Sequence, residues 1–126
     1  KKEKRKKMSN SSKELFDECE KSSNNHSVER VRELVVANGA DVNWKDTSNY
    51  SGLMWACYNN RVETVKYLIT INTINVNLVN NGGQSGFYIA CREGRNETTR
   101  ILLDDPRVDI MLSRTDNWSP LMDAAY

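Results

Sequence analysis

A chain of 126 residues with 38% hydrophobic residues and a formal net charge of +1 has the composition of one globular unit, not of a charge-driven disordered segment. It has no apolar run near the roughly 18 residues that a membrane-spanning helix needs, and no leader of charged and then apolar residues opens it. These features predict an intracellular protein, most simply cytoplasmic, with the nucleus as the alternative. The three cysteines are an odd number spread along the chain, so we interpret them as small buried hydrophobic residues and not as a disulfide framework.

The chain opens with a basic cluster, KKEKRKK, at residues 1–7. We expect a solvated tail or linker over residues 1–11. The alternatives are a nuclear-import or acidic-surface patch, or an arm that contacts nucleic acid or an anionic membrane through Lys1 to Lys7. Both ends look cut, because the first residue is not Met and the last eight residues, SPLMDAAY, begin a unit that they do not finish. We therefore expect a fragment of a longer protein.

An internal period of 34 residues organises the rest of the chain. The segments SGLMWAC, SGFYIAC and SPLMDAA begin at Ser51, Ser85 and Ser119. The apolar pairs at residues 34–35 and 68–69 keep the same offset. A fixed period of this size indicates a repeat architecture, in which each unit buries its apolar face against its neighbours.

Each unit is predicted to be a helical hairpin. Leu53, Ala56 and Cys57 lie at i, i+3 and i+4, which places them on one face of a short helix. A second apolar stripe with helical spacing runs over residues 62–69, and the two asparagines at 59–60 suffice to turn the chain between the helices. The unit thus consists of two short helices joined by a tight turn.

An extended segment follows each hairpin and leads to a tip. Asn49, Gly83 and Asn117 occupy the same register in successive tips. Gly and Asn tolerate a left-handed backbone, so this register marks a tight turn. The Gly-rich segment NNGGQSG at 80–86 coincides with the turn and lacks the Lys–Ser/Thr pair of a nucleotide-binding loop. We interpret it as a hairpin tip and expect no nucleotide.

These features resemble the ankyrin repeat family, whose unit is a β-turn followed by two antiparallel helices with a TPLHxAA signature. The three heptapeptides stand where that signature belongs, and NGADVN at 38–43 stands in the place of the closing segment. The resemblance covers about residues 12–126 and implies an all-α ankyrin solenoid. The Pro of the signature is kept only as Pro120 and becomes Gly52 and Gly86 elsewhere, while its His is absent, so we expect a looser stack.

The resemblance also predicts how the chain is divided. It implies a basic tail or linker over 1–11, an N-terminal capping repeat over 12–46, repeats over 47–80 and 81–114, and a truncated repeat over 115–126. In the capping repeat, LFDEC resembles the first helix, and about four extra residues, placed at 22–27, are expected to bulge from the connection between the helices. Thr99 stands where the apolar stripe has Val31 and Val65, which softens the third unit.

No residue set predicts catalysis or metal binding. The single histidine, His26, lies in the polar SSNNHS loop with no acidic partner at matching spacing, so we interpret it as a solvated loop residue and not as a general base. Equivalent cysteines of stacked repeats are expected about 10 Å apart, too far to share a zinc ion or to form a disulfide. We expect no enzyme activity, cofactor or metal.

The resemblance implies a non-catalytic protein–protein interaction module, a monomeric scaffold or adaptor that binds another protein. The alternative is a substrate-recruiting arm of a larger enzyme whose catalytic domain lies outside this chain. Ankyrin stacks generally bind through the turn tips and the exposed side of the first helix. The positions implied are Thr47, Ser48, Tyr50, Asn81, Gln84, Thr115, Asp116 and Trp118 at the tips, and Tyr58, Asn59, Arg92 and Glu93 at the helix ends.

Aromatic side chains together with Arg make the composition of binding hot spots, so Tyr50 and Trp118 are the strongest candidates. Trp55 and Ile89 are not predicted as contacts, because they face either the groove edge or the adjacent helix. Asn43 and Asn77 resemble the positions that asparaginyl hydroxylases modify in ankyrin repeats, which implies the same modification here.

Overall fold

The computed structural model describes the backbone of residues 2–112 and the side chains of residues 10–112. Six helices lie within this part, paired along the sequence as three helical hairpins. They are α1 (Lys2–Glu20) with α2 (Val28–Val36), α3 (Gly52–Tyr58) with α4 (Val62–Ile69), and α5 (Gly86–Arg92) with α6 (Asn96–Leu103).

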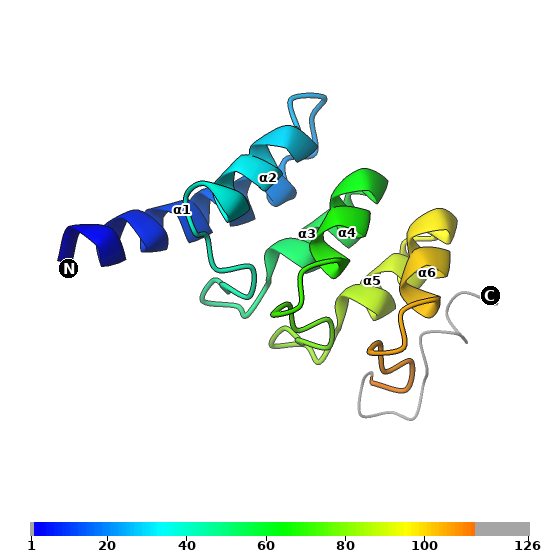
Figure 1. The fold of residues 1–126 in the computed structure, drawn as a ribbon. Helices are drawn as coiled ribbons and strands as arrows, with labels where there is room; N and C mark the ends of the chain where they lie inside the picture. Colours follow the sequence, from blue (N-terminus) through cyan, green and yellow to red (C-terminus); the bar gives the residue numbers. More distant parts are fainter. Residues whose placement is uncertain (1, 113–126) are drawn as a thin grey trace.

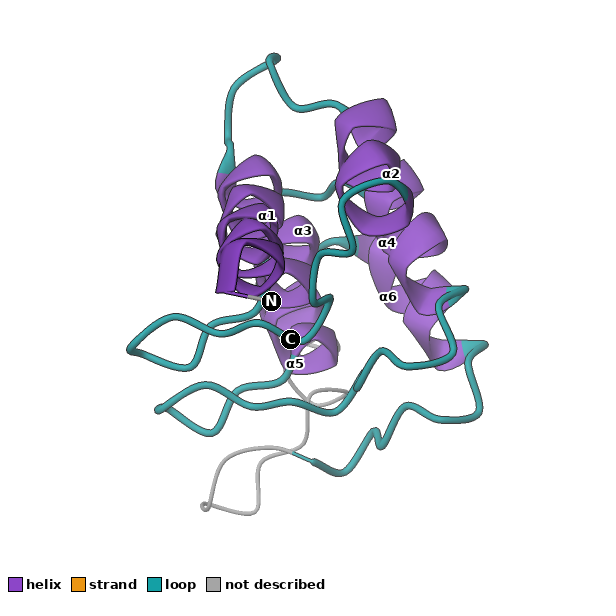
Figure 2. Cartoon of the chain, turned by 60° about the vertical axis from the view of Figure 1, so that its left-hand side comes forward, coloured by secondary structure: helices purple, strands orange, loops and turns teal. Residues whose placement is uncertain are grey.

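The hairpins stack so that first helices contact first helices and second helices contact second helices. Helix α3 lies against α1 and α5, and α4 lies against α2 and α6. Figure 2 shows the resulting two columns, with α1, α3 and α5 in one and α2, α4 and α6 in the other. The predicted all-α repeat solenoid is confirmed, and the described part contains no helix long and apolar enough to cross a membrane.

Serine side chains start the first helices of the second and third units. Ser51 Oγ accepts a hydrogen bond from the Met54 N–H at 3.3 Å, and Ser85 Oγ accepts one from the Tyr88 N–H at 3.1 Å. Such an N-cap satisfies a backbone donor that the first turn leaves unpaired. The hydroxyl therefore defines where these helices begin, although the proline of the family signature is missing.

The tips have the left-handed turns that the register predicts. Asn49 has φ +63° and Gly83 has φ +73°. Each turn is closed by a short antiparallel bridge, Lys45 with Ser51 and Val79 with Ser85. The third predicted turn residue, Asn117, lies outside the described residues.

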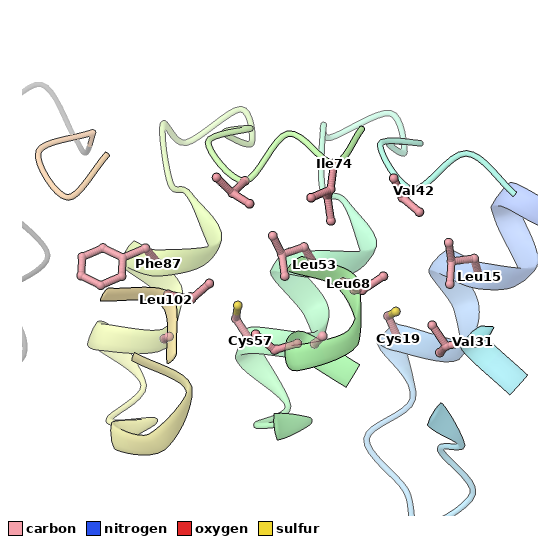
Figure 3. Close-up of a cluster of buried hydrophobic side chains, with 14 of the residues drawn as sticks. Leu15, Cys19, Val31, Val42, Leu53, Cys57, Leu68, Ile74, Phe87 and Leu102 are labelled. Atoms are coloured by element: carbon pink, nitrogen blue, oxygen red, sulfur yellow. The ribbon is translucent and has the colours of Figure 1, made fainter. Parts of the chain in front are cut away.

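The core runs through the stack as repeated layers. Each layer combines an apolar side chain and a cysteine from its first helix with a Leu from its second helix, as Figure 3 shows for Leu53, Cys57 and Leu68; in the first two units a Val joins them. All three cysteines are buried and free, as the sequence predicts. Burial, and secondarily the neighbouring Glu18 carboxylate, raises the pKa of the Cys19 thiol to about 12, so this thiol stays neutral and packs as a hydrophobic group.

Glycine replaces the proline of the signature at the point where a cysteine of the preceding layer packs. A Cβ built on Gly52 would lie 3.3 Å from Cys19 Sγ, and one on Gly86 would lie 3.3 Å from Cys57 Sγ. Such contacts are shorter than side-chain carbons normally make, so a larger residue would require the cysteine to shift by a few tenths of an ångström. Gly52 and Gly86 thus depart from the signature for the same reason, which is the close packing of a cysteine from the preceding layer.

The first unit differs from the others at both ends of α1. This helix has 19 residues, whereas α3 and α5 have seven each. Its helical backbone starts at Lys2, inside the segment expected to be a tail, and projects beyond the other first helices (Figure 1). The loop between α1 and α2 spans residues 21–27 and contains the extra residues that the sequence predicts there.

Candidate functional site

Three aromatic rings form a continuous strip from the base of one tip to the end of α3. Tyr50 stacks on Trp55 with ring centroids 5.2 Å apart and planes inclined by 26°. Trp55 meets Tyr58 edge to face with centroids 5.5 Å apart. Trp55 and Tyr58 are three residues apart on a helix, which places them on one face. We call Tyr50, Trp55 and Tyr58 the aromatic strip.

Within the strip the rings differ in access to solvent. Tyr58 is 40% exposed, whereas Tyr50 and Trp55 are half-buried. The Trp55 Nε1 atom is enclosed and has no hydrogen-bond partner. A buried donor without an acceptor costs about 1–3 kcal/mol. The sequence analysis did not select Trp55, although its spacing from Tyr58 could have shown that the two share a face.

Arg92 and Glu93 take the equivalent places at the end of α5. The Arg92 guanidinium lies 6.0 Å from the ring centroid of Tyr88, and its Nε lies 3.1 Å from a Glu93 carboxylate oxygen. The two predicted site residues therefore form an exposed ion pair. Ile89, at the position equivalent to Trp55, is buried and offers no surface, which agrees with its exclusion.

The predicted amide residues are engaged in contacts between units. Asn59 Nδ2 donates to the Cys19 carbonyl at 3.2 Å and to the Glu20 carbonyl at 3.1 Å, which satisfies the last turn of α1. Asn81 Oδ1 accepts from Asn49 Nδ2 at 2.8 Å and so links neighbouring tips. Gln84 Oε1 accepts from an asparagine of its own tip. These side chains hold the stack together, and any contact with a partner would come in addition.

The remaining predicted positions divide into two groups. Thr47 and Ser48 are exposed at the tip that leads to α3. Thr115, Asp116 and Trp118 lie outside the described residues. No group of three His, Cys, Asp or Glu side chains converges within the described part in a way that could hold a metal ion.

The asparagines implied as modification sites join successive units. Asn43 Nδ2 donates to the Thr73 carbonyl at 2.9 Å, and Asn43 Oδ1 accepts from the Asn75 N–H at 2.7 Å. Asn77 makes the equivalent pair of bonds to the next unit. The Nδ2 and Oδ1 atoms of each side chain thus set the spacing between units. The hydroxylation of Asn43 and Asn77 stays a prediction.

The interpretation of His26 as a solvated loop residue is wrong. Its side chain is only 8% exposed. Nδ1 lies 2.8 Å from the Glu18 carbonyl oxygen, and Nε2 lies 2.6 Å from Thr64 Oγ1. A carbonyl can only accept, so Nδ1 carries the proton, and in the neutral ring Nε2 accepts from the Thr64 hydroxyl.

The enlarged loop turns back over the neighbouring helices and thereby buries His26. The Arg61 guanidinium donates to the carbonyls of Lys21 at 3.0 Å and Ser23 at 2.7 Å. The Glu18 carboxylate accepts from the Ser27 N–H at 2.8 Å. His26 therefore fastens the loop to α1 and α4. Asn60 holds the equivalent position one unit on, where its Oδ1 accepts a hydrogen bond from Thr98 Oγ1 at 3.0 Å.

Three stacked hairpins with tight tips define a helical repeat protein of the solenoid type, in which each unit contacts only its neighbours. The family model for ankyrin repeats, in three copies, matches residues 19–114, and the chain belongs to the ankyrin repeat family. A search of curated proteins returned no match. Ankyrin repeats are generally non-catalytic protein–protein interaction modules.

Proposed function

We propose that this chain is an intracellular adaptor that binds a partner protein through the aromatic strip and the exposed tip beside it. The observation that carries the proposal is the contiguity of Tyr50, Trp55 and Tyr58, whose rings pass from the tip to the first helix without a break. Large aromatic side chains dominate the binding energy of protein interfaces.

Preorganisation supports this surface over the other predicted positions. Tyr50 and Tyr58 both pack on Trp55, so their rings are already held before a partner arrives. Holding a side chain in its bound conformation avoids about 0.5–1.5 kcal/mol of ordering cost per side chain. By contrast, the amides of Asn59 and Asn81 are already committed to contacts within the stack.

The unpaired Trp55 Nε1 supports the same surface. A buried donor without an acceptor is rare in native proteins and calls for an explanation. The sequence period places Trp118 in register with Tyr50, two units on, and we propose that it extends the surface together with Thr115 and Asp116.

The experiment compares Tyr58→Ala with Tyr67→Ala as a matched control. Tyr67 lies in the opposite column on α4, where the Arg32 guanidinium is 4.8 Å from its ring centroid. Proteins captured quantitatively by the wild type and by Tyr67→Ala, but lost with Tyr58→Ala, are the expected partners. For a purified partner, Tyr58→Ala should weaken the Kd at least about tenfold, which corresponds to about 1.4 kcal/mol.

A second pair of substitutions tests the outer part of the surface. Tyr50→Ala combined with Trp118→Ala should also weaken capture at least about tenfold with unchanged helicity. Unaltered capture by both Tyr58→Ala and this double variant would refute the assignment of the surface. The recruiting arm of a larger enzyme would use the same surface, so this experiment tests its binding step as well.

A further inference from the structure

The basic cluster at the start of the chain lies on a helix that is continuous with the stack. Six of the 18 Lys and Arg residues and one of the 17 Asp and Glu residues fall in residues 1–7, so this segment carries +5 and the rest of the chain −4. The backbone from Lys2 onward is part of α1. We call residues 2–9 the basic arm.

The arm precedes the first buried side chains of α1. The first described side chain, Asn10, is exposed, and burial begins at Ser11 and Ser12. At 1.5 Å per residue, the helix before Ser11 is about 13 Å long. Figure 1 shows this end of α1 clear of the other helices. A bound partner could therefore approach the arm without touching the acidic stack.

The charges of the arm are placed unfavourably in the free protein. The N-terminus of a helix carries a partial positive charge, and Lys or Arg side chains in the first turns oppose it. Like charges one turn apart also repel each other. A polyanion bound at this end would remove both penalties.

We propose that the basic arm binds the phosphate backbone of duplex DNA without sequence preference. The five cations of helical residues 2–7 give about one charge per 1.8 Å of helix, close to the one charge per roughly 1.7 Å of a DNA duplex. A helix of this diameter also fits the DNA major groove, which is about 12 Å wide. Met8 is the one apolar residue in the arm, so the arm lacks the apolar face with which amphipathic helices enter a membrane.

The test measures fluorescence anisotropy of a labelled 20-base-pair duplex titrated with the whole chain. If three to five cations contact phosphates, log Kd should rise with log salt with a slope of about 2.7–4.5, and affinity should fall about 40- to 500-fold between 50 and 200 mM NaCl. The variant Lys4→Gln, Arg5→Gln, Lys6→Gln should bind at least about tenfold more weakly at 50 mM NaCl, with its salt slope lowered by up to about 3.

A matched control removes cations from the stack instead. Lys45→Gln with Lys66→Gln changes exposed lysines outside the arm and should leave the affinity within about twofold. Equal losses in the arm and stack variants would refute the assignment to the arm. Tyr58→Ala should not alter DNA affinity, so failure of this proposal is distinct from failure of the aromatic strip.

Vesicles containing phosphatidylserine provide the competing surface. At equal salt they should bind more weakly than the duplex, because the arm has charge but no apolar face. Tighter binding to vesicles than to DNA, or binding of the duplex with a salt slope near zero, would overturn the proposal. Salt-sensitive self-association without DNA binding would overturn it too, since it would assign the arm to the acidic stack of a second copy.

Discussion

Replacing His26 with alanine removes the side chain that joins the enlarged loop to both flanking helices. The change deletes contacts of 2.8 Å to the Glu18 carbonyl and 2.6 Å to the Thr64 hydroxyl. Thr64 is 1% exposed, so its hydroxyl would be left without a partner in the interior. Each unsatisfied buried group costs about 1–3 kcal/mol, and we expect His26→Ala to lower the free energy of unfolding by about 2–4 kcal/mol.

Urea denaturation followed by circular dichroism measures this loss through linear extrapolation. Asn25→Ala is the matched control, because Asn25 is exposed in the same loop; its effect should stay within about 0.5 kcal/mol. If the ring and the hydroxyl are bonded, the double variant with Thr64→Val should lose about 1 kcal/mol less than the sum of the single losses. A cost for His26→Ala as small as that of Asn25→Ala would refute the burial of the ring.

Four further tests address the packing and the charges. Gly52→Ala places a Cβ 3.3 Å from the Cys19 sulfur, so it should lower the free energy of unfolding by about 1–2 kcal/mol in urea titrations. This loss should disappear when Cys19→Ala is also present, and an equal loss with and without Cys19→Ala would contradict the packing account. The buried thiols should resist a soluble disulfide reagent until urea unfolds the chain, and fast reaction of the native protein would disprove their burial. Because the folded pKa of Cys19 is raised to about 12, stability should be full below the unfolded pKa of about 8.5 and decline as pH rises above it, as thermal melts can measure. Hydrogen bonding from Arg107 lowers the pKa of Asp105. The pair therefore stabilises the fold above the unfolded pKa of about 3.9, and this stabilisation is lost as pH falls through the lower folded pKa. Asp105→Asn should weaken the acid dependence of the melting temperature, and an unchanged dependence would refute the pairing.

The features that repeat could be predicted from the sequence because each unit makes the same demand on the backbone. Asn49 and Gly83 differ as residues, yet both adopt the left-handed turn at the same register. The serines that start the first helices recur at the same spacing and form equivalent N-caps. The period alone therefore located the tips, the helix starts and the buried cysteines.

Two features of the first unit were missed because its first helix and its loop are longer than those of the other units. His26 stands in the register of Asn60, which bonds Thr98 as His26 bonds Thr64, so the offset of 34 residues could have indicated that its side chain turns inward. The helical start of α1 was assigned to a tail because of its charge. Residues 1–20 contain neither Gly nor Pro and are rich in Lys, Arg and Glu, which favour helices, so composition could have indicated this helix.

Trp55 was excluded because a single sequence does not show which way a variable side chain points. Its ring lies between Tyr50 and Tyr58, so the surface predicted as separate aromatic residues is one contiguous strip. The equivalent Ile89 is buried, which shows that the same register position can face the surface in one unit and the core in the next.

Stability and binding should be separable by substitution in this chain, because different side chains serve them. The polar side chains between units, such as Asn43 and Asn59, form hydrogen bonds with the backbone of the neighbouring unit and so fix the spacing of the layers. The exposed Tyr58 ring contributes little to the core, so its removal should weaken capture of a partner with little change in melting temperature. Asn59→Ala should do the reverse, lowering the melting temperature by freeing the last carbonyls of α1, and it should weaken binding only in proportion to the unfolded fraction. If both variants lost stability and binding together, the strip would be part of the core and the proposed surface would have to lie elsewhere on the stack.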